Sequence, residues 1–514
     1  MRRREFLQYV SGGIVAVPFA QAPAVITSDR ARPRIDCGVS AGPSGSDRAI
    51  VWAHVDRPSR MMVEYLPTAS TGRPRRVRGS VATPDTGLTA FAQIGDLPAG
   101  QEINYRVSFE DLDGGRTVSA PESGLIKTPR HQNQGIRVAW SADVCGQGWG
   151  IDVARGGMRL FRTMLDVRPD LFIHCGDTIY ADGPLRETVA LDDGSVWRNL
   201  LTPAKEKVAE TLEEFRGNHL YNRLDEHYRR FTAQVGQVVM WDDHEVRDNW
   251  FHDQMLPEAS PYTEKRVGVL AARARQAFLE HYPVTVARTA GARIYRSIPF
   301  GPSMEIFALD MRSHRSPNNA NLQATAGADT HLLGAQQARW LADALTRSKA
   351  TWKVVAADMP LGVVVAHQAG RHEAVANGDH GTPRGREIEI ATLLRTLKTN
   401  RVKNVVWLTA DVHYCAAHRF NPEVAGTRDF EPFWEFIAGP AHAGTFAPGV
   451  LDGTFGCEVQ FNGTPPTLPP NRPPSAGLQF FGLLEIEPGS SELNVSLVNL
   501  AGTRIFQQRF EAAR

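Results

Sequence analysis

The stretch at residues 238–250 reads VVMWDDHEVRDNW: four apolar residues run directly into two aspartates, a histidine and a glutamate. An apolar run of this length is typical of a buried strand. Carboxylates gathered at its end need positive charge nearby, because an unpaired buried charge is costly or is neutralised by a proton. The stretch therefore raises the question of a bound cation, which the other strands help to answer.

Five further apolar runs end in acidic residues. The six predicted strands carry acids at their carboxyl ends as follows: IRVAWSAD ends at Asp143, LFIHCGD at Asp177, VVMWDDHE holds Asp242 and Asp243, MEIFALD ends at Asp310, KVVAAD at Asp358, and NVVWLTADVH holds Asp411 and His413. In layered α/β folds, loops at this edge of the sheet converge on a ligand-binding crevice. Aspartate is also a common turn residue, so one such strand is weak evidence. Six, two of them with a neighbouring histidine, indicate a shared site.

The residue types at these strand ends indicate metal binding. Oxygen ligands suit Ca²⁺, Mg²⁺, Mn²⁺ or Fe³⁺, and imidazole admits Zn²⁺ or iron. The number of candidate ligands favours two metal ions, which can bind a phosphate between them, activate a water molecule and stabilise the leaving oxygen. The five cysteines contain no C-x-x-C pair, which argues against a zinc knuckle and against a fully paired disulfide framework.

The chain of 514 residues has room for two to four domains, and its composition is that of a globular protein. A formal net charge of +1 provides no global field that would favour nucleic acid, and there is no polybasic membrane anchor. No nucleic-acid-binding groove is evident from the sequence. Partners must therefore be inferred from local sites.

The amino terminus, MRRREFLQYVSGGIVAVPFAQAPAVI, has the order of an export signal: arginines, a short apolar run and small residues. Arg3, Arg4, Phe6 and Leu7 match the R-R-x-F-L order of a twin-arginine signal, which we assign to residues 1–24. The apolar run is too short to span a membrane, and no later segment qualifies as a transmembrane anchor. We therefore expect the twin-arginine machinery to export the protein, which becomes periplasmic or secreted.

The remaining chain divides into two predicted parts. Residues 34–128 contain short alternating runs separated by Gly, Pro, Ser and Asp, which predict a small all-β sandwich of fibronectin-like or immunoglobulin-like type. Residues 135–514 alternate strands with helices and predict an α/β layered domain. Residues 186–234 are charged and mostly helical in pattern, with ETLEEFRGNHLYNRLDEHYRRF as the best helix, and indicate an insertion between two strands.

Four motifs resemble those of the PhoD-type alkaline phosphatases and phosphodiesterases. They are CGDTIYAD (175–182), WDDHEVRDNW (241–250), DMPLG (358–362) and TADVHY (409–414), and SADVCGQGWGI is similar to an entry motif seen in part of that family. The resemblance covers nearly the whole chain. It implies a twin-arginine signal, a small β-sandwich and a metallophosphoesterase-like catalytic domain that cleaves phosphoric esters with two or more metal ions, iron (Fe³⁺) and calcium being the expected ones.

The resemblance also implies roles for individual residues. Asp177 would bridge the two metals, Asp143, Tyr180 and His413 would complete one site, and Asp243 and Asp411 would serve the other, calcium-like site. His244 would hydrogen-bond the phosphate and protonate the leaving alkoxide, with Asp242 and Glu245 orienting the residues around it.

Two assignments stay open at the level of sequence. Some family members use a cysteine as an iron ligand in the first motif, so Cys145 is an alternative to Asp143, which we favour because it directly follows the strand. Arg312 is a candidate for phosphate binding, and Arg247, Asn249 and His442 are weaker ones.

The leading hypothesis from the sequence is an exported, metal-dependent hydrolase of phosphoric esters. One alternative keeps the same ligands but acts as a phospholipase D-like phosphodiesterase. A second alternative, a non-catalytic binding protein of the cell envelope, is disfavoured because a purely structural metal site does not need His244 beside a metal ligand. The sequence does not distinguish monoesters, diesters and phospholipids as substrates.

Overall fold

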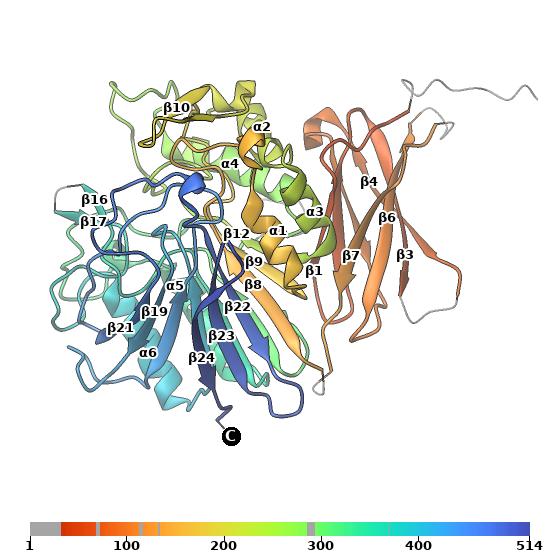
Figure 1. The fold of residues 1–514 in the computed structure, drawn as a ribbon. Helices are drawn as coiled ribbons and strands as arrows, with labels where there is room; N and C mark the ends of the chain where they lie inside the picture. Colours follow the sequence, from red (N-terminus) through yellow and green to blue (C-terminus); the bar gives the residue numbers. More distant parts are fainter. Residues whose placement is uncertain are drawn as a thin grey trace, which may run out of the picture.

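The computed structural model describes residues 32–67, 72–112, 117–131, 134–284, 293–368 and 370–513. The predicted export signal at residues 1–24 lies outside the described residues. Within the described part, no helix combines the length and apolar character needed to cross a membrane. Figure 1 shows a small β-sandwich beside a larger α/β part.

Seven described antiparallel strands form the sandwich. One sheet contains β1 (Val39–Pro43), β2 (Ala49–His54) and β5 (Thr89–Ile94), and the other contains β4 (Arg75–Ala82), β3 (Ser59–Pro67), β6 (Glu102–Asp111) and β7 (Glu122–Lys127). Along β6, Ile103 and Val107 are buried whereas Glu102 and Arg106 are exposed, the alternation expected of a strand with one face on a core. The predicted all-β sandwich is confirmed.

Two larger sheets form the second part. The first has the order β12 (Gly236–Met240), β9 (Leu171–Cys175), β8 (Ile136–Ser141), β22 (Phe480–Ile486), β23 (Leu493–Asn499) and β24 (Arg504–Phe510). The second has the order β13 (Arg296–Pro299), β14 (Met304–Ala308), β15 (Trp352–Ala356), β18 (Val405–Thr409), β20 (Phe433–Ile437), β19 (Ala416–Phe420) and β21 (Cys457–Asn462). Strands β12, β9 and β8 are parallel, as are β14, β15, β18 and β20, so their carboxyl ends lie at one edge of each sheet.

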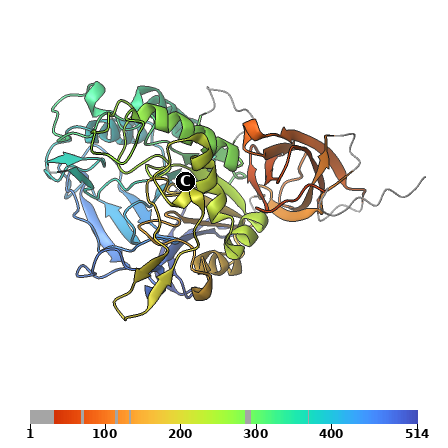
Figure 2. The ribbon, with the colours of Figure 1, turned by 90° about the horizontal axis from the view of Figure 1, so that it is seen from above.

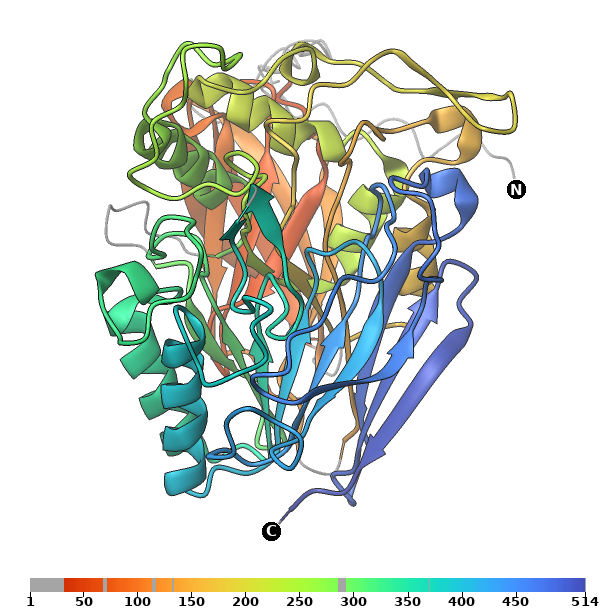
Figure 3. The ribbon, with the colours of Figure 1, turned by 90° about the vertical axis from the view of Figure 1, so that its left-hand side faces the viewer.

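The two sheets pack face to face between helices. Val138 and Ile173 of the first sheet share an apolar core with Ile306 and Val354 of the second. On the outer face of the second sheet lie α5 (Gly334–Arg347) and α6 (Glu387–Thr399), seen at the lower left of Figure 3. The helices on the side of the first sheet are α1 (Arg159–Asp166), α2 (Leu212–Asn222), α3 (Glu226–Gln234) and α4 (Val267–His281). The predicted α/β layered architecture is therefore observed, with two sheets as the inner layers.

The insertion between β9 and β12 is less helical than the sequence pattern predicts. It begins with a hairpin of β10 (Thr188–Ala190) and β11 (Val196–Arg198), and the single helix predicted at residues 210–231 is divided into α2 and α3. The division has a local cause, because the side chain of Asp225 accepts a hydrogen bond from the backbone of Tyr228 and so caps a new helix.

The sandwich is docked onto this insertion and onto α4 (Figure 2). The guanidinium of Arg223 lies 3.9 Å from the ring centroid of Trp52 in β2, and the Trp52 indole donates to the carbonyl of Glu280 in α4. Arg216 of α2 binds the Glu280 carboxylate and donates to the carbonyl of Asp85 in the sandwich. Buried charge and aromatic contacts therefore join the two parts.

Candidate metal centre

Five of the six predicted strand ends deliver their acids to one region, and the sixth does not. Asp310, which follows β14, instead accepts hydrogen bonds from the Trp241 indole and from its own loop at Arg312 and Ser313. Aspartate commonly closes the turn that follows a strand in this way. The prediction that all six strands deliver their carboxylates to a common site is therefore wrong for Asp310.

Several candidate ligands sit in an unusual backbone conformation. Asp143, Asp177, Asp411 and His413 have φ angles of 64°, 49°, 66° and 58°, in the left-handed region that residues other than glycine seldom adopt. Such conformations carry strain and persist only where the surrounding structure enforces them, often at functional sites. The loops after β8, β9 and β18 therefore hold these side chains at some energetic cost.

Their ligand atoms form three overlapping groups, each with all atoms within 4.8 Å of one another. The groups among the described residues are Asp143, Asp177 and His413; Asp177, Asp243 and His244; and Asp242, Asp243 and Asp411. Asp177 and Asp243 each belong to two groups, so a side chain at either position lies between two potential cation sites. The seven residues of the three groups come from four separate loops.

Several oxygen atoms at this site are buried but have no hydrogen-bond donor among the described residues, as expected of atoms that bind a cation. Asp143 is fully buried, and neither of its carboxylate oxygens has a hydrogen-bond partner among the described residues. Asp243 Oδ1 and the side-chain oxygen of Asn249 are likewise buried and have no hydrogen-bond partner among the described residues. Buried polar atoms are nearly always satisfied, so several unsatisfied oxygens in one place indicate a bound ion.

The electrostatics agree with the geometry. Burial, reinforced by neighbouring acids, raises the pKa of Asp143 and of Asp411 well above the usual range of a carboxyl group. Burial also raises the pKa of Asp177 well above that range, although His244 opposes the shift. Without added positive charge, burial favours the protonated form of these groups, whereas nearby cations would favour the ionised form that binds metal.

We expect metal to stabilise the protein more strongly as the pH rises. The raised pKa values of Asp143, Asp177 and Asp411 mean that, without metal, the folded state loses stability as the pH rises from the ordinary carboxyl pKa of about 4. Bound cations remove this loss. The difference in Tm between metal-loaded and EDTA-treated protein should therefore widen between about pH 5 and pH 8 in scanning calorimetry. A difference that shrank over this range would contradict the expectation.

Tyr180 and His413 adjoin Asp143, as the resemblance implies. Burial lowers the pKa of His413 to about 4, so its ring is neutral. Its Nδ1 donates to the carbonyl of Gly444 at 2.5 Å, which leaves Nε2 with a free lone pair that accepts from the Tyr180 hydroxyl at 2.7 Å. Both the phenol oxygen and Nε2 are therefore placed to bind a metal beside Asp143, whose Oδ1 is 3.6 Å from Nε2.

Cys145, the alternative to Asp143, lies elsewhere. It is buried in an apolar cluster with Ile151 and Phe161, and burial raises the pKa of its thiol. No cysteine belongs to any of the three ligand groups found in the described ranges. The geometry favours Asp143 over Cys145 as the ligand.

His244 faces the pocket and is held by Asp182, a residue of the CGDTIYAD motif for which the sequence predicted no role. His244 Nδ1 lies 2.8 Å from Asp182 Oδ1, and its ring lies over that of Tyr180, with the centroids 4.2 Å apart. Burial lowers the pKa of His244, but the carboxylates of Asp182, Asp243 and Asp177 outweigh burial and raise it well above the ordinary value. Asp182 thus fixes the ring and favours its protonated form.

Glu245 joins the two central loops. One of its oxygens accepts from the backbone and hydroxyl of Thr178, and the other accepts from the backbone of Asp242. Because Thr178 follows Asp177, this buried carboxylate ties the loop after β9 to the loop after β12. These contacts support the orienting role expected of Glu245.

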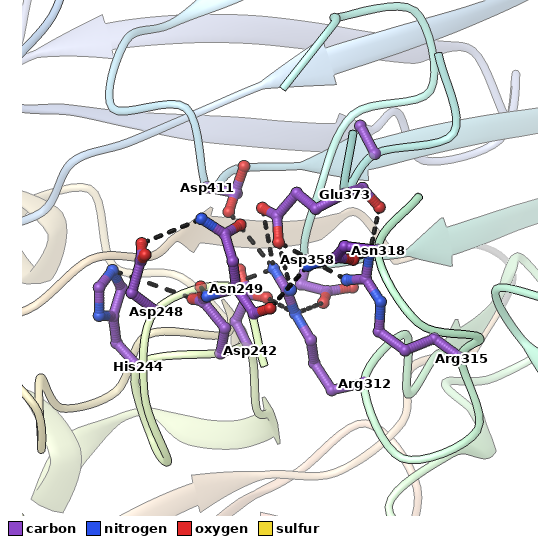
Figure 4. Close-up of polar contacts among 12 residues, drawn as sticks. Asp242, His244, Asp248, Asn249, Arg312, Arg315, Asn318, Asp358, Glu373 and Asp411 are labelled. Carbon is purple, nitrogen blue, oxygen red and sulfur yellow. Dashed lines mark hydrogen bonds and ion pairs between the residues drawn. The ribbon is translucent and has the colours of Figure 1, made fainter. Parts of the chain in front are cut away.

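Arg312, the predicted phosphate-binding residue, lies behind the ligands, within an acidic network (Figure 4). Its side chain is 0% exposed, donates to Asp242 and donates to Glu373 at 2.7 Å. Asp358 lies 3.5 Å away, and Asp411 lies 3.7 Å away. Arg312 is therefore placed to offset the repulsion among these acids. It is not among the described residues that line the pocket.

Glu373 was not singled out in the sequence. It follows β17 (Arg371–His372), the second strand of a short hairpin with β16 (Ala366–Gln368), and not one of the acid-tipped parallel strands. It accepts from Arg312, and Arg315 lies 3.6 Å away. Only the folded arrangement brings this acid to the site.

A pocket of about 290 Å³ opens onto the three ligand groups. Asp177, Asp243, His244, Asp411 and His413 are among the residues that line it.

Of the weaker phosphate-binding candidates, only Asn249 lines the pocket. The side chain of Arg247 donates to Gln254, and His442 Nε2 contacts the carbonyl of Gly150.

Comparison with known proteins supports the fold and the family. The model of the PhoD-like phosphatase family matches residues 138–497, and the model of its N-terminal domain matches residues 20–129. Alkaline phosphatase D of Bacillus subtilis (strain 168) is 29% identical over 294 residues, 55% of this chain, and the match spans 47% of that relative, about half its length.

Two solved structures share the architecture. A structure of PhoD superposes with a TM-score of 0.67 at 19% identity, over 93% of this chain and 92% of the other. The purple acid phosphatase PPD1 from seeds of yellow lupin (Lupinus luteus) gives a TM-score of 0.56 at 12% identity, over 93% of this chain and 74% of the other. The predicted metallophosphoesterase-like fold, preceded by a β-sandwich, is confirmed.

Proposed function

Because this chain belongs to the PhoD-like phosphatase family, we propose that it hydrolyses phosphoric esters in the pocket described above. The proposal depends above all on one observation, that Asp177 and Asp243 each belong to two overlapping groups of metal-binding atoms. Cations held there would neutralise the phosphate and make a water molecule acidic enough to act as the nucleophile.

We assign the candidate ligands by their grouping and by the family resemblance. Asp177 would bridge the two cations, Asp143, Tyr180 and His413 would complete one site, and Asp243 and Asp411 would serve the other. Asn249, whose side-chain oxygen has no partner in the described part of the chain, is available to either the second cation or the phosphate.

His244 is the proposed acid. Asp182 holds its Nδ1, which leaves Nε2 to donate a hydrogen bond to the phosphate and then a proton to the leaving alkoxide. The three carboxylates that raise the pKa of His244 favour the protonated ring that this role requires. A merely structural metal centre would have no use for a protonated histidine at the mouth of a pocket.

The test is hydrolysis by the purified, metal-loaded protein. We expect release of p-nitrophenol from p-nitrophenyl phosphate or bis-p-nitrophenyl phosphate, and its loss after chelation, with metal content measured on the same sample. A metal-loaded protein that hydrolyses neither ester would support the alternative of a non-catalytic binding protein.

We further propose that the site beside Tyr180 holds Fe³⁺ and that the other holds calcium. A trivalent cation depresses the pKa of a bound phenol, so Tyr180 would bind as phenolate and give a visible charge-transfer band. Tyr180→Phe should abolish this band, measured by absorption spectroscopy with iron content as the control. A colourless, iron-free and fully active wild-type enzyme would exclude this assignment while leaving the other ligands unaffected.

Export by the twin-arginine route is also proposed, from residues 1–24. Replacing Arg3 and Arg4 together by lysine should retain the protein inside the producing bacterium, and cell fractionation would show this. Unchanged export of that variant would rule out the twin-arginine route.

A further inference from the structure

Part of the pocket lining is apolar and adjoins the candidate metal ligands. The residues that form it are Val363, Val364, Val365, Ala366, Val412 and Phe446. They come from three separate segments of the chain, and Val364, Val365, Val412 and Phe446 are partly exposed. We refer to these six residues as the apolar wall.

Backbone hydrogen bonds fix the apolar wall to the metal centre. The backbone N–H of Val364 donates to the carbonyl of Val450 at 2.9 Å, which joins two of the loops. The backbone N–H of Phe446 donates to the carbonyl of His413 at 3.1 Å, and the two rings meet nearly edge to face with centroids 5.5 Å apart. Phe446 is therefore held against a candidate metal ligand, within reach of any group attached to the phosphate.

Apart from His244, whose protonated ring is assigned to the phosphate and the leaving oxygen, the described residues that line the pocket offer no side-chain cation to an anionic organic group. Among the described residues that line it there is no lysine or arginine, whereas Asp248 and Glu373 add acids beyond the metal ligands. Two arginines close to this lining, Arg312 and Arg315, are buried and face Glu373 (Figure 4). Besides the neutral side chains of Gln147, Asn249 and Tyr414, a second negative charge on the substrate would meet acids or apolar carbon.

We propose, on the basis of the proposed phosphoric ester hydrolysis, that the substrate is a phosphoric ester whose organic group is apolar and uncharged and packs against the apolar wall. Apolar surface removed from water favours binding, and a carboxylate or further phosphate at the same place would lose hydration without gaining a partner. Val365 and Phe446 are then specificity-determining residues.

The test compares three diesters with the same leaving group: methyl, butyl and 3-carboxypropyl p-nitrophenyl phosphate. The wild-type enzyme should show a kcat/KM about 10-fold higher for the butyl than for the methyl ester, because its three additional methylene groups are partly buried. The carboxypropyl ester, of similar length, should be no better than the methyl ester.

Two variants locate the effect. Val365→Ser and, separately, Phe446→Ala should reduce the ratio of kcat/KM for the butyl ester to kcat/KM for the methyl ester to about 2- to 3-fold or less. Val459, which is 47% exposed on β21 outside the pocket, provides the matched control Val459→Ser, which should keep the full preference.

The outcomes separate the two proposals. Hydrolysis of the methyl ester with no butyl preference, or with a preference for the carboxypropyl ester, would overturn the apolar specificity and leave the proposed function standing. A butyl preference that persists in both pocket variants would place the apolar contact elsewhere and overturn this assignment. If the metal-loaded wild-type enzyme hydrolyses p-nitrophenyl phosphate but none of the three diesters, this inference is overturned and the proposed function stands. Failure on p-nitrophenyl phosphate and on all three diesters would overturn both.

Discussion

Asp177→Asn is expected to abolish hydrolysis and to reduce bound metal. Asp177 contributes oxygens to two of the three ligand groups, so it supplies negative charge to both cation sites, and an amide of the same shape does not. We expect kcat/KM to fall about 1,000-fold, the upper part of the range of about 100- to 1,000-fold seen when one preorganised electrostatic group is lost, because here both cation sites are weakened. The measurements are kcat/KM on p-nitrophenyl esters and metal content by elemental analysis.

Asp310→Asn is the matched control for this variant. Asp310 is also buried and also follows a parallel strand, but its carboxylate bonds to Trp241 and to its own loop. The control should therefore keep its metal. If Asp177→Asn retained both metals, Asp177 would be excluded as the bridging residue, and if Asp310→Asn lost metal equally, the assignment of the site to five strand ends would be wrong.

The position of the candidate metal centre could be predicted because the direction of each strand follows from the order of its residues. Apolar runs ending in acid place carboxylates at the carboxyl edge of parallel strands, and the acids of five of the six strands lie around the centre as that rule requires. The exception, Asp310, shows the limit of the rule. An aspartate after a strand can bind a cation or close its own turn, and the residues on either side do not decide between these outcomes.

Partners that lie far apart in the chain could not be predicted. Glu373 is 61 residues from Arg312, and nothing in its own segment, EAVANG, marks it as part of the site. Without Glu373 as a known partner, Arg312 near a strand end was a reasonable candidate for phosphate binding. Likewise, Asp182 stands in a recognisable motif, but its contact with His244 depends on two loops that meet only in the folded protein.

The prediction of a single helix at residues 210–231 was wrong for a different reason. Its overall helical pattern is correct, but periodicity averages over several turns and does not register a capping contact such as that of Asp225, which starts a second helix. This affects how the β-sandwich docks, because Arg223, which stacks on Trp52, lies at the break between the two helices.

Arg312→Ala is expected to destabilise the protein by about 3–5 kcal/mol, because it removes the buried partner of Asp242 and Glu373 and leaves those carboxylates uncompensated. The free energy of unfolding, measured in denaturant with metal present, is the appropriate quantity. Arg395→Ala is the control, since Arg395 pairs with Asp429 on the surface with its side chain 58% exposed, and its loss should change stability by about 1 kcal/mol or less.

This prediction decides between two roles for the same arginine. If Arg312 bound the phosphate, Arg312→Ala would fold with nearly normal stability, keep its metal and show a raised KM. The geometry favours the other result, because the guanidinium is 0% exposed and lies among Asp242, Asp358, Asp411 and Glu373, where its charge opposes the mutual repulsion of acids that also face the cation sites. Loss of that charge should therefore lower stability most in metal-free protein and less when cations are present. A destabilisation that is the same with and without metal would show that Arg312 acts on folding alone and is not coupled to the metal centre.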